Sequence, residues 1–185
     1  MSARERVLGR VRDAIQKRAK TEHPGAFEGW RPRASVQAGV DGFAAMLEAA
    51  GGEVVRLPDD AAAVAWLARF CRDFPAASLG HTVPVELRPP LPTAPPDAAP
   101  LGVSMARGAI AETGSLLMDA RDGRRAQLLP PTHVVFVRAL AVHATFRNAL
   151  VAMRDDLPSA IGLHSGPSKS ADIGHIMVKG VHGPG

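Results

Sequence analysis

Two short segments of the sequence carry side chains that could bind or transform a small anionic molecule. The first is a loop rich in glycine and hydroxyl groups, and its predicted ligand-binding residues are Gly166, Ser168, Lys169, Ser170 and Asp172. The apolar residues Ile161 and Leu163 precede it, so the pattern predicts a strand, a tight loop and a helix that starts near Ala171. Free N–H groups of a first helical turn, together with the Lys169 charge, would attract a negative group.

The same loop also has a purely structural interpretation. Ser168 or Ser170 could cap the predicted helix, and Asp172 would favour the positive end of its dipole. The sequence Gly-Pro-Ser-Lys-Ser lacks the glycine spacing of a Walker loop, and it comes too late in the unit for a dinucleotide-binding fingerprint. Both interpretations stay open at this point.

The second segment is Ala111-Glu-Thr-Gly-Ser115, which lies between two predicted strands. A carboxylate at a strand edge could act as a general base, as a nucleophile, or as an acceptor for a ligand hydroxyl. A carboxylate that accepts backbone N–H groups in a turn is the structural alternative. We predict Glu112 as the catalytic residue and Thr113, Gly114 and Ser115 as ligand-binding residues.

Three further side chains are candidates for ligand contacts. Arg125, next to Arg124, could pair with an anion, although such arginines more often pair locally. His133 and His182 could donate hydrogen bonds to a loop or ligand. The histidines do not have the spacing of a known metal-ligand motif, so no metal site is predicted; they include His133, His164, His175 and His182.

These residues must be positioned by a sheet. Helical and extended patterns alternate along residues 35–185, which predicts an α/β domain with a mostly parallel sheet and helices on both faces, in three layers. Ligands of such sheets bind at the carboxyl ends of the strands. The loops after Val103 and Leu163 both lie at such ends, so the turn at Glu112 and the loop at Gly166 are predicted to face each other across one hollow.

The predicted elements follow from these patterns. The expected helices are one around residues 43–47 that ends at Gly51-Gly52, one from Asp59 or Asp60 to Phe70, and one over residues 140–154. The expected strands are 53–57, 77–81, 101–103 and 132–137. The last of these is apolar on both faces, as a central parallel strand should be. Seven prolines between Thr82 and Pro100 predict an irregular loop, and residues 121–125 predict a polar turn.

Residues 1–34 form a separate predicted region, a basic helix followed by a linker. Apolar residues repeat at helical spacing over residues 3–19: Val7, Leu8, Val11, Ala14 and Ile15. This stripe needs a partner, which could be the body of the chain, a second copy in a homo-oligomer, or another protein. A membrane surface is less favoured because the helix has no aromatic anchors.

The composition excludes several functions. Cys71 is the only cysteine, so the chain can supply neither an internal disulfide nor the four thiolates of an iron–sulfur cluster, and its apolar helical setting predicts a buried thiol. Residues 1–20 carry a net charge of +5 and the rest −1; with no Tyr and two Trp, nucleic-acid binding is not predicted. No stretch reaches the ~20 apolar residues of a membrane span, and the charged start of the chain predicts a cytoplasmic location.

Four ordered motifs resemble one known family. They are Ala111-Glu-Thr-Gly-Ser115, Leu129-Pro-Pro-Thr-His133, Gly166-Pro-Ser-Lys-Ser-Ala-Asp-Ile173 and Gly180-Val-His-Gly-Pro184. Together they are similar to the lactate utilization protein C family, the single-domain form of the LUD domain, over residues 100–184. The resemblance implies a fold like the NagB/RpiA/CoA transferase group.

The resemblance also implies a role. This chain would be an accessory subunit in the oxidation of L-lactate to pyruvate, beside two cysteine-rich partner proteins that hold the iron–sulfur clusters. The resemblance does not assign a catalytic step to this chain. By analogy of fold, Glu112 is placed like the glutamate nucleophile of CoA transferases, and the Gly166 loop like a phosphate or carboxylate site. Relatives continue past the position of Gly185 into another short strand, so if the protein ends at Gly185, a sheet edge is expected to be either missing or supplied by a partner.

The alternative function is a stand-alone small-molecule enzyme. Its fold would be CoA transferase-like or folate cyclo-ligase-like, and its ligand would be phosphorylated or carboxylated. The pairing of Glu112 with the loop at Gly166–Lys169 motivates this alternative.

Overall fold

The computed structural model describes residues 2–17, 38–171, 177–179 and 183–184. The chain divides into two compact units, residues 1–34 and 35–185, and each is described by itself. None of the helices in these ranges is long and apolar enough to cross a membrane.

The described part of the first unit is the helix α1, Ala3–Lys17. Its start is encoded locally by a capping box, because Ser2 Oγ accepts the Glu5 N–H (3.2 Å) while the Glu5 carboxylate accepts the Ser2 N–H (2.5 Å). None of its residues is buried. The predicted N-terminal helix is confirmed.

The second unit contains a parallel sheet in the order β1-β2-β5, formed by β1 (Ala77–Leu79), β2 (Leu101–Met105) and β5 (Thr132–Phe136). β2 is the central strand and is almost fully buried, whereas every residue of β5 is only partly buried. The prediction that residues 132–137 form the central strand is therefore wrong. The apolar character of both faces of β5 has a different cause, which is the groove described below.

The backbone of β5 has one side turned toward β2 and one side turned away from it. Thr132 donates its N–H to Pro100 O (3.3 Å), and Phe136 O accepts the N–H of Ala106 (2.8 Å). Since backbone directions alternate along a strand, His133 and Val135 point their N–H and C=O groups away from β2. Among the described strands, none pairs with this outer edge.

A second, mixed sheet continues the first, in the order β6-β3-β4-β7. Its strands are β6 (Val142–His143), β3 (Gly108–Ile110), β4 (Ser115–Asp119) and β7 (Ile161–His164). β6 is parallel to β3, while β4 is antiparallel to both β3 and β7. This arrangement places the start of β4 next to the end of β7, because Leu116 pairs with His164.

A short antiparallel hairpin consists of β8 (Lys169–Ala171) and β9 (Met177–Lys179). The predicted helix start near Ala171 is therefore wrong, because residues 169–171 pair as a strand with residues 177–179. Neither Ser168 nor Ser170 can cap a helix there. The anion site at a first helical turn, which depended on this helix, loses its basis.

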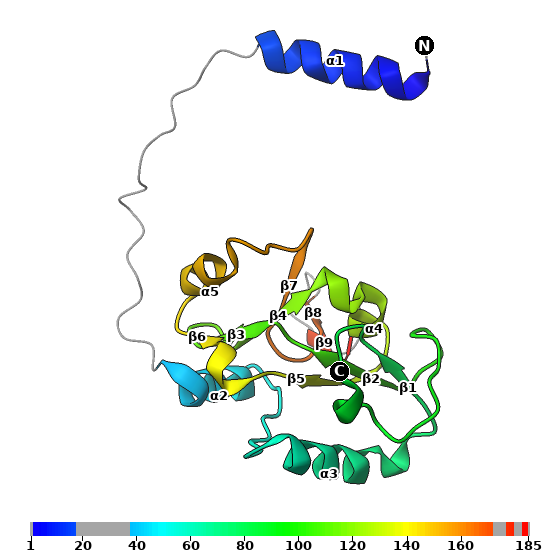
Figure 1. Ribbon diagram of the computed structural model, residues 1–185, viewed down its shortest axis with the longest axis vertical. Coiled ribbons are helices and arrows are strands. Elements are labelled where there is room, and N and C mark those ends of the chain that lie inside the picture. Colours follow the sequence, from blue (N-terminus) through cyan, green and yellow to red (C-terminus); the bar gives the residue numbers. More distant parts are fainter. Residues whose placement is uncertain (1, 18–37, 172–176, 180–182, 185) are drawn as a thin grey trace. The chain divides into compact units, whose positions relative to one another are not determined.

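The helices of the second unit cover the sheets. They are α2 (Gly39–Ala49), α3 (Asp60–Phe70), α4 (Arg124–Leu128) and α5 (Phe146–Met153). Asp59 caps α3 by accepting the Ala62 N–H (2.7 Å). α3 and α4 lie on opposite sides of the parallel sheet (Figure 1), which gives three layers. Leu67 of α3 packs with Leu101 and Val103 of β2 in the main core. The predicted α/β fold with a mostly parallel sheet is confirmed.

Several predicted boundaries differ from the structure. Residues 53–57 form no strand. The predicted helix over residues 140–154 is divided among a 3-10 turn, β6 and α5. The predicted polar turn at residues 121–125 is largely helical. The Pro-rich loop contains one 3-10 turn, Val85–Leu87. In the described parts of the chain, three further 3-10 turns lie at Cys71–Asp73, Ala120–Asp122 and Ala139–Ala141.

Candidate functional site

A groove of about 980 Å³ follows β5 and opens on both of its faces. This volume is at the upper end of the range for small-molecule sites. One part is apolar and includes Trp66, Phe70 and Val134. The other part is polar, and its lining includes His133, His164, Ser165, Ser168 and Lys169. The groove therefore offers an apolar surface next to a cluster of hydrogen-bonding side chains.

Two histidines, from β5 and β7, lie together in the polar part. Their ring centroids are 6.4 Å apart, with an edge-to-face angle of 61°. His133 Nε2 shares a 2.9 Å hydrogen bond with Ser104 Oγ on the neighbouring strand. Partial burial lowers the pKa of His133 to about 4, helped by the nearby His164 and opposed by Asp122. Burial also lowers the pKa of His164. Both imidazoles are therefore neutral at pH 7 and can each donate and accept a hydrogen bond.

A chain of hydroxyl groups connects the turn after β3 to the wall of the groove. Thr113 Oγ1 lies 2.7 Å from Ser115 Oγ, which lies 2.6 Å from Ser165 Oγ. Ser115 is buried, while Ser165 lines the groove. The predicted ligand-binding residues Thr113 and Ser115 thus reach the groove only through Ser165.

The two turns predicted to face each other meet at the C-terminal end of α2. Gly114 is so close to this helix that an added Cβ would lie 2.6 Å from the Met46 carbonyl carbon. Gly166 packs against Ala50, where a Cβ would lie 3.1 Å from the carbonyl oxygen. Lys169 donates from Nζ to the same Ala50 oxygen. The ammonium group therefore neutralises the negative end of α2 as well as lining the groove.

Glu112 does not line the groove. Its Oε1 accepts the N–H of Phe146 (2.8 Å) at the first turn of α5. Carboxylates stabilise helix N-termini, so the geometry matches the structural alternative considered from the sequence. Its predicted catalytic role stays a prediction.

The remaining predicted site residues are dispersed. Arg125 pairs with Asp97 on the surface (3.3 Å) and does not line the groove. Ser170 lies in β8, and Asp172 and His182 are outside the described residues. Within the described ranges, no group of three His, Cys, Asp or Glu side chains is arranged to hold a metal ion.

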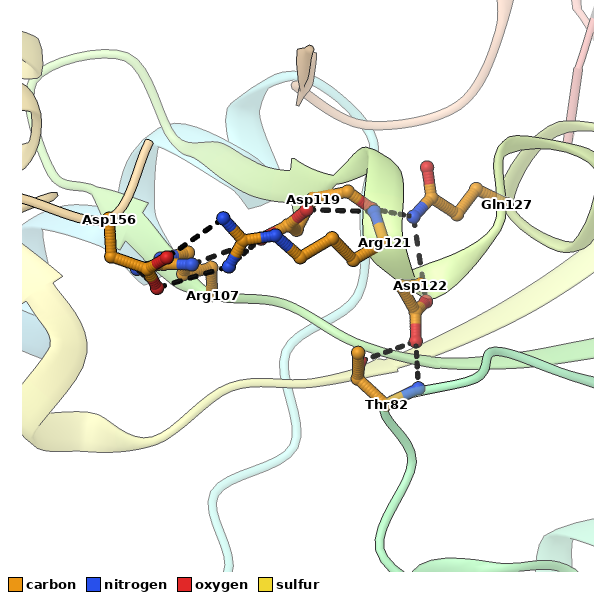
Figure 2. A network of polar contacts seen from close by, with 7 residues as sticks. All are labelled: Thr82, Arg107, Asp119, Arg121, Asp122, Gln127 and Asp156. Carbon is orange, nitrogen blue, oxygen red and sulfur yellow. Dashed lines mark hydrogen bonds and ion pairs between the residues drawn. The ribbon is translucent and has the colours of Figure 1, made fainter. Parts of the chain in front are cut away.

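A polar network that was not predicted from the sequence lies at the end of β4 (Figure 2). Asp156 accepts from Arg121 (2.8 and 3.0 Å) and from Arg107 (2.7 Å). These guanidinium groups, that of Arg121 first, hold the pKa of Asp156 well below its usual range. Arg107 also donates to Asp119 (3.1 Å). The network ties the connection between α5 and β7 to the sheet.

Asp122 is the most deeply buried member of this network. It is fully shielded from solvent, and its carboxylate accepts the Thr82 N–H (2.9 Å), the Thr82 hydroxyl (2.5 Å) and Gln127 Nε2 (3.5 Å). These donors hold the loop after β1 against α4. The Asp122 charge also reaches His133, whose pKa it raises against the effect of burial.

Comparison with known proteins shows that part of the chain is similar to one family. Residues 97–185 match the LUD domain family. The chain is 33% identical over 96 residues to lactate utilization protein C of Macrococcus caseolyticus and to that of Bacillus subtilis. The C-terminal half of the chain thus resembles a LUD domain. The predicted resemblance to lactate utilization protein C is thereby confirmed.

The extent of these matches is limited. The alignments cover 48% of this chain and 42% and 40% of the two relatives, so the matched region spans less than half of their length. A DUF162 family protein from Deinococcus radiodurans has a similar fold, with a TM-score of 0.57 and 19% identity over 78% of this chain and 90% of its own.

The polar groove residues named above, His133, His164, Ser165, Ser168 and Lys169, lie within the region that matches the LUD domain, whereas α2 and α3 precede it. Sequence reasoning missed His164 and Ser165 as groove residues. Their position at the end of a predicted strand could have identified them, since α/β sheets bind ligands at the carboxyl ends of their strands. Asp122 gave no comparable indication, because its partners Thr82 and Gln127 come from separate segments.

Proposed function

We propose that this chain acts in lactate utilization, as an accessory subunit of a cytoplasmic iron–sulfur system that oxidises L-lactate to pyruvate. The observation that carries the proposal is the LUD domain at residues 97–185, with its 33% identity to lactate utilization protein C. Two cysteine-rich partner proteins hold the iron–sulfur clusters. Cys71, whose pKa is raised by burial in the core under α3, is not available to ligate a cluster.

In this role the groove beside β5 binds a small carboxylate. Neutral His133 and His164, with the hydroxyls of Ser165 and Ser168, supply donors for a carboxylate and for the hydroxyl or keto group beside it. The adjacent apolar surface accommodates a methyl group. Because both imidazoles are neutral, they can also exchange roles as donor and acceptor with a 2-hydroxy or 2-oxo acid.

The test is deletion of this protein in cells that grow on lactate, together with anaerobic purification of the tagged full-length chain. The proposal expects growth on lactate and lactate oxidation by extracts to be lost, and the cysteine-rich partners to co-purify. Intact lactate oxidation after deletion, with no co-purification, would refute it. A double variant, His133→Gln and His164→Gln, should lose activity while keeping the partners, and Arg147→Gln on the exposed face of α5 is the matched control.

A second candidate is favoured by the size of the groove. With about 980 Å³ it exceeds the needs of lactate and could take a larger phosphorylated or carboxylated ligand, as a CoA transferase-like or folate cyclo-ligase-like enzyme would. A thermal-shift panel of CoA, nucleotides and organic acids tests this, because ligand at 100 times its Kd adds about 2.7 kcal/mol of stability. No shift, or a shift unchanged by Lys169→Ala and His164→Gln in the groove, would reject this second candidate and leave the lactate role to its own test.

A further inference from the structure

Within the first unit, the helix α1 carries an apolar stripe that no other described residue of that unit covers. Its large aliphatic side chains are all exposed, with Val7 at 59%, Val11 at 48% and Ile15 at 66%. Val7, Val11 and Ile15 follow one another at intervals of four residues, and Leu8 lies beside them at i−3 from Val11. The stripe is therefore continuous along the helix.

Basic side chains border this stripe on both sides. Arg10 is three residues after Val7 and so lies next to it on one border. Arg12 is four residues after Leu8 and three before Ile15, which places it on the other border. Asp13 lies on the opposite face of the helix, and the Glu5 carboxylate is held by the Ser2 N–H. Over Ala3–Lys17 there are five basic and two acidic side chains, a net charge of +3.

This pattern excludes one obvious occupant. Two copies of α1 would bring like charges together along both borders of their contact, which opposes pairing. A coiled coil also needs apolar heptads over three or more repeats, and α1 has 15 residues. The charge of the borders favours an anionic surface instead.

The charge on the borders of the stripe favours a flat anionic surface over a deep protein groove. Helices that bind in protein grooves rely on large anchors in pockets, often aromatic. The stripe of α1 contains only Val, Leu, Ala and Ile, so it lacks aromatic anchors for a protein pocket and for a bilayer alike. The positive charge on both borders matches a plane of anionic groups on either side of the helix, and this charge outweighs the missing aromatic anchors that made a membrane surface less favoured from the sequence.

We propose that α1 binds the surface of an anionic lipid bilayer. The helix would lie in the plane of the interface, with Val7, Leu8, Val11 and Ile15 in contact with the acyl boundary and Arg10 and Arg12 among the head groups. Each basic residue near an anionic membrane strengthens binding by roughly fivefold. The apolar stripe is short, so binding is reversible and sensitive to salt.

The test is co-sedimentation of the full-length chain with vesicles of phosphatidylcholine alone, or of equal parts phosphatidylcholine and phosphatidylglycerol. Binding is expected only to the anionic vesicles, and about 1 M salt should remove it, since the Debye length is then about 3 Å. The double variant Arg10→Glu and Arg12→Glu should lose at least a hundredfold in affinity. Arg72→Glu with Arg147→Glu reverses the same number of exposed charges on the second unit and should bind like the parent.

A second variant tests the apolar contact separately. Val11→Ala with Ile15→Ala keeps helix propensity and charge but reduces the stripe, and should weaken binding at least tenfold. Binding unaffected by these alanines would mean general electrostatic adsorption, and binding equal on both vesicle types would mean no role for charge; either result overturns the proposal. Absence of binding to either kind of vesicle also overturns the proposal. In that case, a dimer found by light scattering that dissociates in the Val11→Ala, Ile15→Ala variant would assign the stripe to a second copy of the chain.

Discussion

The contact between the Gly114 turn and α2 predicts a large and specific cost for adding one methyl group. Gly114 has φ +62°, and a Cβ there would lie 2.6 Å from the Met46 carbonyl carbon, 2.9 Å from Leu47 Cα, and closer still to the Leu47 nitrogen. All three atoms belong to the backbone, so no flexible side chain can move aside. Gly114→Ala should therefore push the turn away from the helix.

Two contributions set the magnitude. The left-handed conformation costs an alanine about 1–2 kcal/mol, and overpacking costs about 1–3 kcal/mol more. Gly39→Ala separates them, because Gly39 also has a positive φ of +82° but no atom within 4 Å of its Cβ position. The gain from a less flexible unfolded chain is similar at both sites and cancels in the comparison. Gly114→Ala should be less stable than Gly39→Ala by about 1–3 kcal/mol.

The assay is urea unfolding of both full-length variants and the parent chain, followed by circular dichroism and compared at equal m-values. The additional loss of stability in Gly114→Ala should be accompanied by a weaker hydrogen bond between the Ser115 and Ser165 hydroxyls. This weakening should be detectable as faster amide hydrogen exchange in β7. Equal destabilisation by the two substitutions would refute the inference that this turn and α2 are in backbone contact.

Three other outcomes follow from buried groups. The pKa of His133 is near 6.5 in the unfolded chain and about 4 in the folded chain, so the unfolded chain binds the proton first as the pH falls. The free energy of unfolding should therefore decrease by about 3 kcal/mol as the pH drops from 6.5 to 4. His133→Gln should remove most of this pH dependence, which urea titrations at several pH values would measure. Asp122→Ala should lower the free energy of unfolding by about 2–4 kcal/mol, because it leaves the buried donors of Thr82 and Gln127 unpaired. Asp122→Asn should lower it by less in the same urea titration. Equal losses for the two variants would contradict this account. The Cys71 thiol, buried and with a raised pKa, should react with a disulfide reagent only at the rate of unfolding, and a fast native-state reaction would contradict its burial.

Local patterns predicted local structure well. The apolar spacing of α1 and the capping aspartate of α3 predicted both helices to within two residues, because side-chain caps and i, i+4 contacts are encoded in neighbouring residues. The α/β class followed from the alternation of such elements. The same reasoning failed for residues 53–57, where β-branched residues suggested a strand that no neighbouring strand pairs with.

The position of β5 and the partners of the polar side chains depend on contacts between distant residues. Thr132–Phe136 was predicted as a strand, but no local pattern says whether a strand is central or at an edge. Glu112 is engaged by Phe146, 34 positions further along the chain, and Asp122 by Thr82, 40 positions earlier. The hollow predicted between two turns is instead a groove beside β5, because both turns pack onto α2.

The outer edge of β5 has a consequence for the behaviour of the protein in solution. This apolar strand contains no lysine or proline, and its outward-facing amides pair with none of the described strands, so its outer edge is a template for association with other chains. Since the groove runs along this strand, a compound that occupies it also shields the template. Slower aggregation on mild heating is therefore a convenient first screen for compounds that bind there, even before any turnover can be measured.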